Sequence, residues 1–119
     1  MRALSIRQPW AELIIRGLRN EFRSGPTKVR GRVYIYACKA NGVDPGEMEE
    51  INDEFGTRLD LSGLPRGLLI GTAEIVECEK IGCADYEWIM ARPKRIKPYR
   101  KPSGIPQPRF FDPFPDGRA

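Results

Sequence analysis

The segment of residues 5–32 limits the fold most, because two strand signals and one helix signal follow each other there with little spacer. Apolar and polar residues alternate over residues 3–7, which predicts a strand with one buried face. Pro9 suits the first position of a helix, since it has no N–H group to leave unpaired, and Gly17 favours the helix end. Trp10 lies on the apolar stripe of this helix, so we expect it to anchor the helix in the core; stacking on a base is the alternative.

Four polar residues gather in the second half of this segment: Glu21, Arg23, Thr27 and Arg30. The run Glu21-Phe22-Arg23 indicates a short strand, in which Phe22 points into the core and the two charged residues share the opposite face. These polar side chains are candidates for a site. The alternative for Glu21 and Arg23 is a surface salt bridge, which contributes less than about 1 kcal/mol to stability.

The rest of the chain adds further strands and one strong helix signal. Residues 32–38 are apolar on both faces, so this strand is expected in the centre of a sheet. Asp44, Pro45 and Glu47 form a capping pattern that starts a helix, and Gly56 ends it. Three more strands are expected, at residues 67–81 with a β-bulge at Ile75-Val76, at residues 86–90 and at residues 109–111.

Together these elements predict an α+β fold, a small mixed β-barrel of five or six strands with two main helices flanking a cleft. A chain of 119 residues suits one domain. We assign residues 1–111 to this domain and expect residues 112–119 to form a loose C-terminal tail.

The residue types that are present exclude several kinds of chemistry. The chain has no histidine, which excludes a Ser-His-Asp triad, a Cys-His pair and imidazole acid–base catalysis. Its three cysteines form no C-x-x-C pair, so neither a disulfide framework nor a zinc site is expected. We therefore expect no metal, no cofactor and a reducing, cytoplasmic location. No apolar run reaches the ~20 residues of a membrane span and the N-terminus lacks a signal-peptide pattern, so no membrane association is expected.

Positive charge is concentrated at both ends of the chain, although the net charge is only +4. Residues 1–36 hold eight basic and two acidic residues, and residues 92–119 hold the same numbers, whereas the middle of the chain is acidic. If the fold brings the two ends together, they form a positive face that attracts phosphates. A solubilising surface with a basic tail is the alternative.

The most basic stretch, residues 92–102, combines lysine and arginine with three prolines. Proline does not sit in a central strand, so this stretch is expected at a sheet edge or in an extended loop. Tyr99 stands among the basic residues, a pattern typical of contacts to single-stranded nucleic acid, although a solvated basic loop is the alternative. The candidate contacts are Arg92, Lys94, Arg95, Lys97 and Arg100.

Three motifs follow each other in the opening segment: LSIRQPWAELIIRG at residues 4–17, E-x-R at residues 21–23 and T-x-x-R-G at residues 27–31. This combination resembles the ASCH domain family (activating-signal-cointegrator homology), a branch of the PUA-like barrels. Later fragments also fit this family: residues 33–37 and 69–73, Trp88, Gly104 and Phe110-Phe111.

The chain departs from the family pattern at Arg19. The family usually has a lysine there, and the segment before Glu21 is one residue shorter in this chain. An arginine stays protonated at any working pH, so it cannot easily act as a base or nucleophile. It can still bind a phosphate or a carboxylate through two parallel hydrogen bonds. The substitution therefore favours binding over catalysis.

The resemblance implies a cleft lined by the E-x-R strand and the T-x-x-R-G loop, and it implies RNA-related ligands. The first hypothesis is a non-catalytic module that holds RNA or a nucleotide in this cleft. Glu21 would accept a hydrogen bond from an exocyclic amine or orient Arg23, and Thr27 would donate its hydroxyl. Phosphates or base edges would be contacted by Arg19, Arg23 and Arg30.

The second hypothesis is a small hydrolase that acts on a modified nucleoside or on an RNA phosphodiester. Glu21 would be the general base, and Thr27 would be the nucleophile or an orienting hydroxyl. Arg19 or Arg23 would stabilise the oxyanion. Lys28 is the nearest lysine, and it would have to turn into the cleft to replace the lysine of the family.

Overall fold

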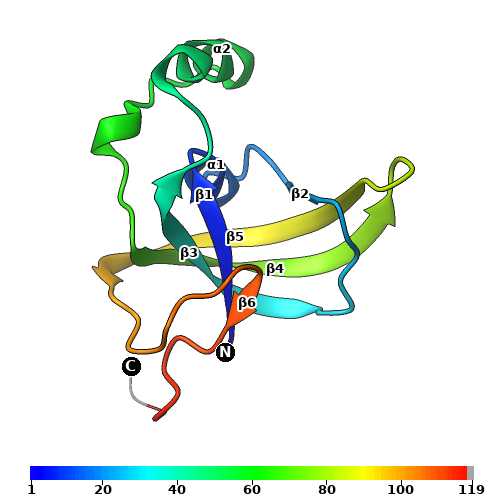
Figure 1. Cartoon of the computed structure of the whole chain (residues 1–119), viewed down its shortest axis with the longest axis vertical. Helices are drawn as coiled ribbons and strands as arrows, with labels where there is room; N and C mark the ends of the chain where they lie inside the picture. The colour runs from blue at the N-terminus through cyan, green and yellow to red at the C-terminus, as the bar shows by residue number, and fades with distance from the viewer. Residues whose placement is uncertain (118–119) are drawn as a thin grey trace.

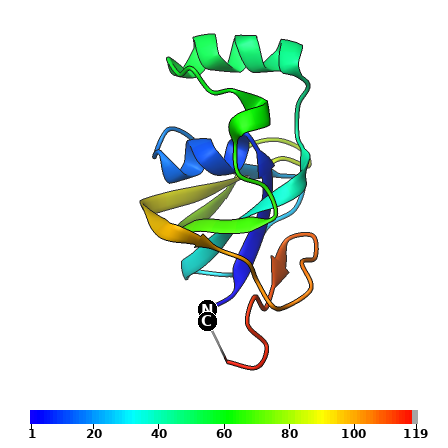
Figure 2. The ribbon, with the colours of Figure 1, turned by 90° about the vertical axis from the view of Figure 1, so that its left-hand side faces the viewer.

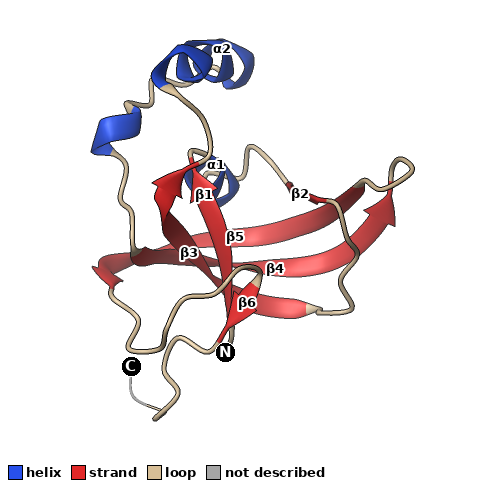
Figure 3. Cartoon of the chain, in the orientation of Figure 1, coloured by secondary structure: helices blue, strands red, loops and turns tan. Residues whose placement is uncertain are grey.

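The computed structural model describes residues 1–117 and has an α+β fold with six strands and two α-helices (Figures 1 and 3). The sheet is mixed, since β1 pairs with β3 in parallel and the other pairs are antiparallel. A short 3-10 helix, Leu61–Gly63, lies between the second α-helix and the next strand. In chain order the elements are β1 (Ala3–Gln8), α1 (Trp10–Ile15), β2 (Glu21–Arg23), β3 (Gly31–Asn41), α2 (Pro45–Phe55), β4 (Leu68–Lys80), β5 (Tyr86–Arg100) and β6 (Phe110–Phe111).

The strand order is β2-β5-β4-β3-β1-β6. β3 therefore lies inside the sheet, which confirms the expectation from its two apolar faces. The expected β-bulge is also confirmed, because the register between β4 and β5 shifts between Ile75 and Glu77. The basic stretch forms the second half of β5, where β4 is its strand neighbour and β2 pairs only with residues 86–88. It is thus a sheet edge, one of the two expected arrangements.

The sheet is strongly curved but not closed into a barrel, so the barrel expectation is not confirmed (Figure 1). β2 and β6 lie at the two ends of the strand order, and within residues 1–117 no backbone pairing joins β2 to β1 or β6. Side chains bridge the gap. Arg23 Nη2 donates to the carbonyl of Ser5 on β1 at 2.6 Å, and the ring of Trp88 on β5 stacks on Phe110 of β6 with 5.8 Å between centroids.

Helix α1 packs against the sheet and supplies part of the main core. Ala11, Ile14 and Ile15 are buried together with apolar residues of β1, β3, β4 and β5. Pro9 is the N-cap rather than the first helical residue, since helical geometry begins at Trp10. Gly17 adopts a left-handed φ of +73°, as expected for the residue after a helix.

Helix α2 stands apart from the sheet, with α1 between the two (Figure 2). Its buried residues Met48 and Ile51 pack with Leu13 of α1 in a second, smaller core. Asp44 is the N-cap, and a capping box joins it to Glu47: Glu47 N donates to Asp44 Oδ1 at 2.8 Å, and Asp44 N donates to Glu47 Oε1 at 3.2 Å. The predicted helix start is confirmed.

Replacing Asp44 with alanine should lower the free energy of unfolding by about 1 kcal/mol, because the amide of Glu47 loses its acceptor. Urea unfolding followed by circular dichroism measures this change. Asp53→Ala on the exposed face of the same helix is the matched control and should change stability by less than about 0.5 kcal/mol. Equal effects of the two substitutions would contradict a stabilising capping box.

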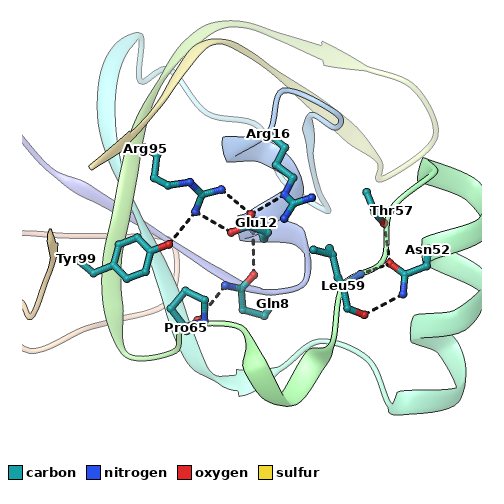
Figure 4. A network of polar contacts seen from close by, with 9 residues as sticks. All are labelled: Gln8, Glu12, Arg16, Asn52, Thr57, Leu59, Pro65, Arg95 and Tyr99. Carbon is teal, nitrogen blue, oxygen red and sulfur yellow. Dashed lines mark hydrogen bonds and ion pairs between the residues drawn. The ribbon is translucent and has the colours of Figure 1, made fainter. Parts of the chain in front are cut away.

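A polar network ties α1 to β5 (Figure 4). The carboxylate of Glu12, only 3 % exposed, accepts two hydrogen bonds from Arg95, at 3.0 and 2.6 Å, and one from Arg16 at 2.7 Å. Arg95 also donates to the hydroxyl of Tyr99 at 2.9 Å. Gln8 completes the network, since its side chain accepts from Glu12 N and donates to a carbonyl of the loop before β4.

The first residues after β6 pack against the rest of the domain. Pro113 is buried, its carbonyl accepts from the amides of Ser103 and Gly104, and the ring of Phe114 meets Tyr34 edge-on with 6.1 Å between centroids. These contacts attach residues 113–114, which belong to the expected loose tail, to the folded domain. The last two residues of that tail, 118–119, lie outside the described residues.

Candidate nucleic-acid interface

A cavity of about 690 Å³ lies on the side of the sheet where β2 and β1 face each other without pairing. β1 and β2 form two of its walls, the end of β3 forms a third, and the segment before β6 closes it. Its lining residues are Ser5, Ile6, Arg7, Trp10, Arg19, Glu21, Phe22, Arg23, Tyr36, Cys38, Lys39, Ala40, Pro106, Gln107, Pro108 and Arg109.

Five cations and one carboxylate line this cavity. Glu21 is the carboxylate, and the cations are Arg7, Arg19, Arg23, Lys39 and Arg109. All but Lys39 come from the two basic ends of the chain, which meet because β1 pairs with β6 and Ser5 N donates to the carbonyl of Arg109 at 2.7 Å. A concave site with excess positive charge attracts anionic ligands. The fold therefore gathers basic residues from the two basic ends at one cavity.

Glu21 is the polar centre of the cavity wall. It is only 5 % exposed, and Arg23 Nε donates to its Oε2 at 2.7 Å. The prediction that these two side chains share a face is confirmed. The prediction that Phe22 points into the core is wrong, since Phe22 is 41 % exposed. The reason is the register, because Glu21 lies opposite Trp88 and opposed residues of an antiparallel pair project to the same side. The buried carboxylate also contradicts a surface salt bridge.

Arg23 connects three parts of the site. It binds Glu21, donates to the carbonyl of Ser5, and places its guanidinium 5.4 Å from the centre of the Trp88 ring. Arg109 approaches the same ring at 5.2 Å and donates to the carbonyl of Pro26 at 2.6 Å. These bonds fix both guanidinium groups at the cavity before any ligand arrives.

Arg19 contacts two aromatic rings of the cavity wall. Its guanidinium carbon lies 4.0 Å from the centre of the Trp10 ring and 4.7 Å from that of Phe22. Its Nη1 is 3.8 Å from Glu21 Oε1, an ion pair without a hydrogen bond. Burial lowers the pKa of Arg19, although Glu21 and Glu54 act in the opposite direction.

The remaining walls are apolar or weakly polar. Trp10 and Tyr36 supply aromatic surface suited to a planar ligand, and Ile6 adds aliphatic surface. Burial raises the pKa of the Cys38 thiol and of the Tyr36 hydroxyl, so both stay protonated at neutral pH. A protonated thiol is a poor nucleophile, and Cys38 is therefore part of the wall rather than a reactive group.

The T-x-x-R-G loop does not reach this cavity. Thr27 Oγ1 accepts from the amide of Val29 at 3.1 Å, and Arg30 donates to the carbonyl of Thr27 and to Glu77 on the surface. Lys28 is exposed and does not line the cavity either. The structure brings Arg19, Glu21 and Arg23 together, and it does not bring Thr27, Lys28 or Arg30 to them.

The basic half of β5 also lies outside the cavity lining, and two of its arginines are paired with carboxylates. Arg95 binds Glu12, and Arg92 binds Glu74, whose pKa is lowered by hydrogen bonds from Arg92. Three further candidates lie along or near this strand: Lys97 over the ring of Tyr99 at 4.0 Å, Arg100 over Phe114 at 4.6 Å, and the exposed Lys94.

Several residues that line the cavity were missed from the sequence, among them Arg7, Tyr36, Lys39 and Arg109. Arg7 had a local signal, since it is the outward residue of the predicted first strand. Tyr36 and Lys39 line the cavity only because β3 lies beside β1. Arg109 lines the cavity because β6 pairs with β1, and no local sequence pattern reveals this pairing.

Residues 1–117 lack two features that would point to other functions. No helix within residues 1–117 is long and apolar enough to cross a membrane. The same residues contain no group of three or more histidine, cysteine, aspartate or glutamate side chains placed to hold a metal ion.

Comparison with known proteins gives a consistent assignment. The ASCH domain profile matches residues 4–102. Activating signal cointegrator 1 of Homo sapiens is 35 % identical over 81 residues, which cover 63 % of this chain and 14 % of that protein. The protein of the same name from Mus musculus is 33 % identical over the same shares. The chain thus spans about a seventh of the length of these relatives. Because the profile covers most of the sequence, this chain belongs to the ASCH domain family.

Proposed function

We propose that this domain binds single-stranded RNA or a nucleotide in the cavity between β1 and β2. The observation that carries the proposal is the lining, in which five cations surround one buried carboxylate and flat apolar walls. Phosphates require the cations, base edges require a few oriented polar groups, and base faces require flat apolar surface. One site offers all three.

Each group has a place in this proposal. Arg7 and Lys39 are exposed at the cavity and reach the phosphates, while Arg23 and Arg109 are already fixed and read a base edge or the sugar. Glu21 Oε1 accepts a long hydrogen bond from the amide of Phe22, at 3.3 Å, and none from a side chain within the described residues, so it keeps capacity for an exocyclic amine or a ring N–H. In this proposal the curved sheet, bridged by the side chains of Arg23 and Trp88, would replace the closed barrel of the PUA-like proteins.

The hydrolase alternative requires a nucleophile or a lysine beside Glu21. Thr27 and Lys28 do not line the cavity, and the carboxylate of Glu21 is bound by Arg23. Binding without turnover is therefore better supported by the geometry. Turnover of an N4-acylated cytidine or of single-stranded RNA that Glu21→Gln abolishes would favour the hydrolase.

Affinity for a fluorescein-labelled, single-stranded RNA should fall with salt, because binding releases counterions from the phosphates. With about two phosphate contacts, from Arg7 and Lys39, log K against log[salt] should have a slope of about −1.4. Lys39→Gln should reduce this slope by about 0.7 and weaken binding about five- to tenfold at 50 mM salt. Fluorescence anisotropy measures both quantities.

Arg58→Gln is the matched control, since Arg58 is exposed and lies outside the cavity lining. It should leave both slope and affinity unchanged. Absence of RNA binding at low salt, or equal losses for Lys39→Gln and Arg58→Gln, would contradict the proposed site.

A further inference from the structure

The wall beneath the guanidinium of Arg19 separates two cavities. The second cavity, of about 510 Å³, lies between the end of α2 and the strands β2 and β5. Trp10, Arg19 and Phe22 line both cavities. These three side chains are therefore the partition between them, and the partition consists of two aromatic rings with a planar cation against both.

Arg19 is weakly bound in this position compared with the other arginines of the site. Its one hydrogen bond within the described chain is 3.3 Å long, to the carbonyl of Asn20, and its ion pair with Glu21 is 3.8 Å long. Arg23, by contrast, makes hydrogen bonds of 2.7 and 2.6 Å. A guanidinium has five N–H donors, so most of those of Arg19 are unused. Ring contact, rather than hydrogen bonding, holds it.

The rings of Trp10 and Phe22 are not fully buried by the rest of the protein. Phe22 is among the exposed large hydrophobic residues, and Trp10 is only partly buried. An exposed aromatic ring beside a second ring is costly to leave in water and is typical of a stacking platform for bases. The guanidinium of Arg19, which is planar and delocalised, covers the surface that a nucleobase would cover.

We propose that the space between Trp10 and Phe22 is a stacking site for a nucleobase, and that Arg19 occupies it until a base displaces the guanidinium. The inference rests on the proposed function, since it names the group of the RNA or nucleotide that enters the partition. Displacement joins the two cavities and frees the cation of Arg19 for the phosphate of the same nucleotide. Arg19 thus acts both as a removable plug and as a phosphate contact.

Separate ligands test the two roles. Adenosine has a base and no phosphate, and ribose 5-phosphate has a phosphate and no base. Arg19→Ala should tighten adenosine binding about tenfold, because the base no longer competes with the guanidinium, and it should weaken ribose 5-phosphate binding. Phe22→Ala should abolish adenosine binding. Arg58→Ala, outside both cavities, should change neither.

Quenching of tryptophan emission reports binding at the partition, because Trp10 lines both cavities whereas Trp88 is fully buried. Arg19→Gln provides a second variant that keeps most of the side chain without its charge, and it should also tighten adenosine binding. Circular dichroism checks that each variant is folded.

Two results would overturn the inference. One is weaker binding of both ligands to Arg19→Ala, which would make Arg19 a phosphate contact only. The other is adenosine binding that Phe22→Ala leaves intact. Salt-dependent RNA binding that responds to Lys39→Gln, together with either result, would leave the proposed function standing and reject only the stacking site.

Discussion

Replacing Trp88 with alanine should lower the free energy of unfolding by about 4 kcal/mol, the largest effect we expect from one substitution. Trp88 is fully buried in the main core, where its removal leaves a large cavity. Its Nε1 donates to the carbonyl of Gly25 at 3.0 Å, and its ring stacks on Phe110. Trp88 therefore joins β5 to β6 and to the loop after β2, across the open side of the sheet.

Trp88→Phe separates the ring from the hydrogen bond. It keeps an aromatic face for Phe110, Arg23 and Arg109, so it should cost about 1–2 kcal/mol and retain RNA binding. Trp88→Ala should weaken RNA binding even where the variant is folded, because both guanidinium groups lose their support. Urea unfolding and fluorescence anisotropy measure the two effects. Equal stability of the alanine and phenylalanine variants would contradict this account.

Glu12→Ala should lower the free energy of unfolding by about 2–3 kcal/mol and the melting temperature by about 10 °C. Glu12 is the buried acceptor that links α1 to β5, and its loss leaves Arg95 and Arg16 without their carboxylate. The expected loss is smaller than the roughly 3–5 kcal/mol usual for a broken buried pair, because both arginines are partly exposed and can turn to water. Glu49→Ala, exposed on α2, is the matched control and should have little effect.

The carboxylate of Glu12 also makes the stability of the fold depend on pH. Burial alone would raise the pKa of Glu12, but hydrogen bonds and charge from Arg95 and Arg16 outweigh it and lower the pKa below the ordinary value of 4.5. A depressed pKa in the folded state stabilises the fold above the unfolded value, and this contribution is lost as the pH falls through the folded value. The wild type should therefore lose stability below about pH 4.5 more steeply than Glu12→Ala. Parallel pH profiles of the two proteins in urea unfolding would contradict this role of Glu12.

Much of the fold could be predicted because its signals are local. The capping residues of α2, the two apolar faces of β3 and the phase change at Ile75-Val76 are each contained in a few neighbouring residues, and the structure confirms all three. Closure of the sheet is not local. It depends on whether β2 pairs with β1 or β6, and within the described chain a guanidinium and a ring stack bridge them instead.

The site was predicted in part, for a related reason. Period two correctly places Glu21 and Arg23 together, but the buried face of an end strand is decided by its one neighbour. Here that neighbour presents Trp88, which brings the carboxylate inward and leaves Phe22 outside. Proximity in sequence does not ensure proximity in the fold, since Thr27 and Arg30 do not line the cavity whereas Lys39 does.

The most direct test of the central claim is where RNA contacts the domain. Two-dimensional ¹H–¹⁵N NMR spectra, recorded while a short single-stranded RNA is added, report each backbone amide and the two tryptophan indoles. The cavity account predicts shifts for Arg7, Phe22, Lys39 and the indole N–H of Trp10, with little change along residues 92–100. Shifts confined to residues 92–100 would contradict it and would assign RNA binding to the basic edge of β5 instead.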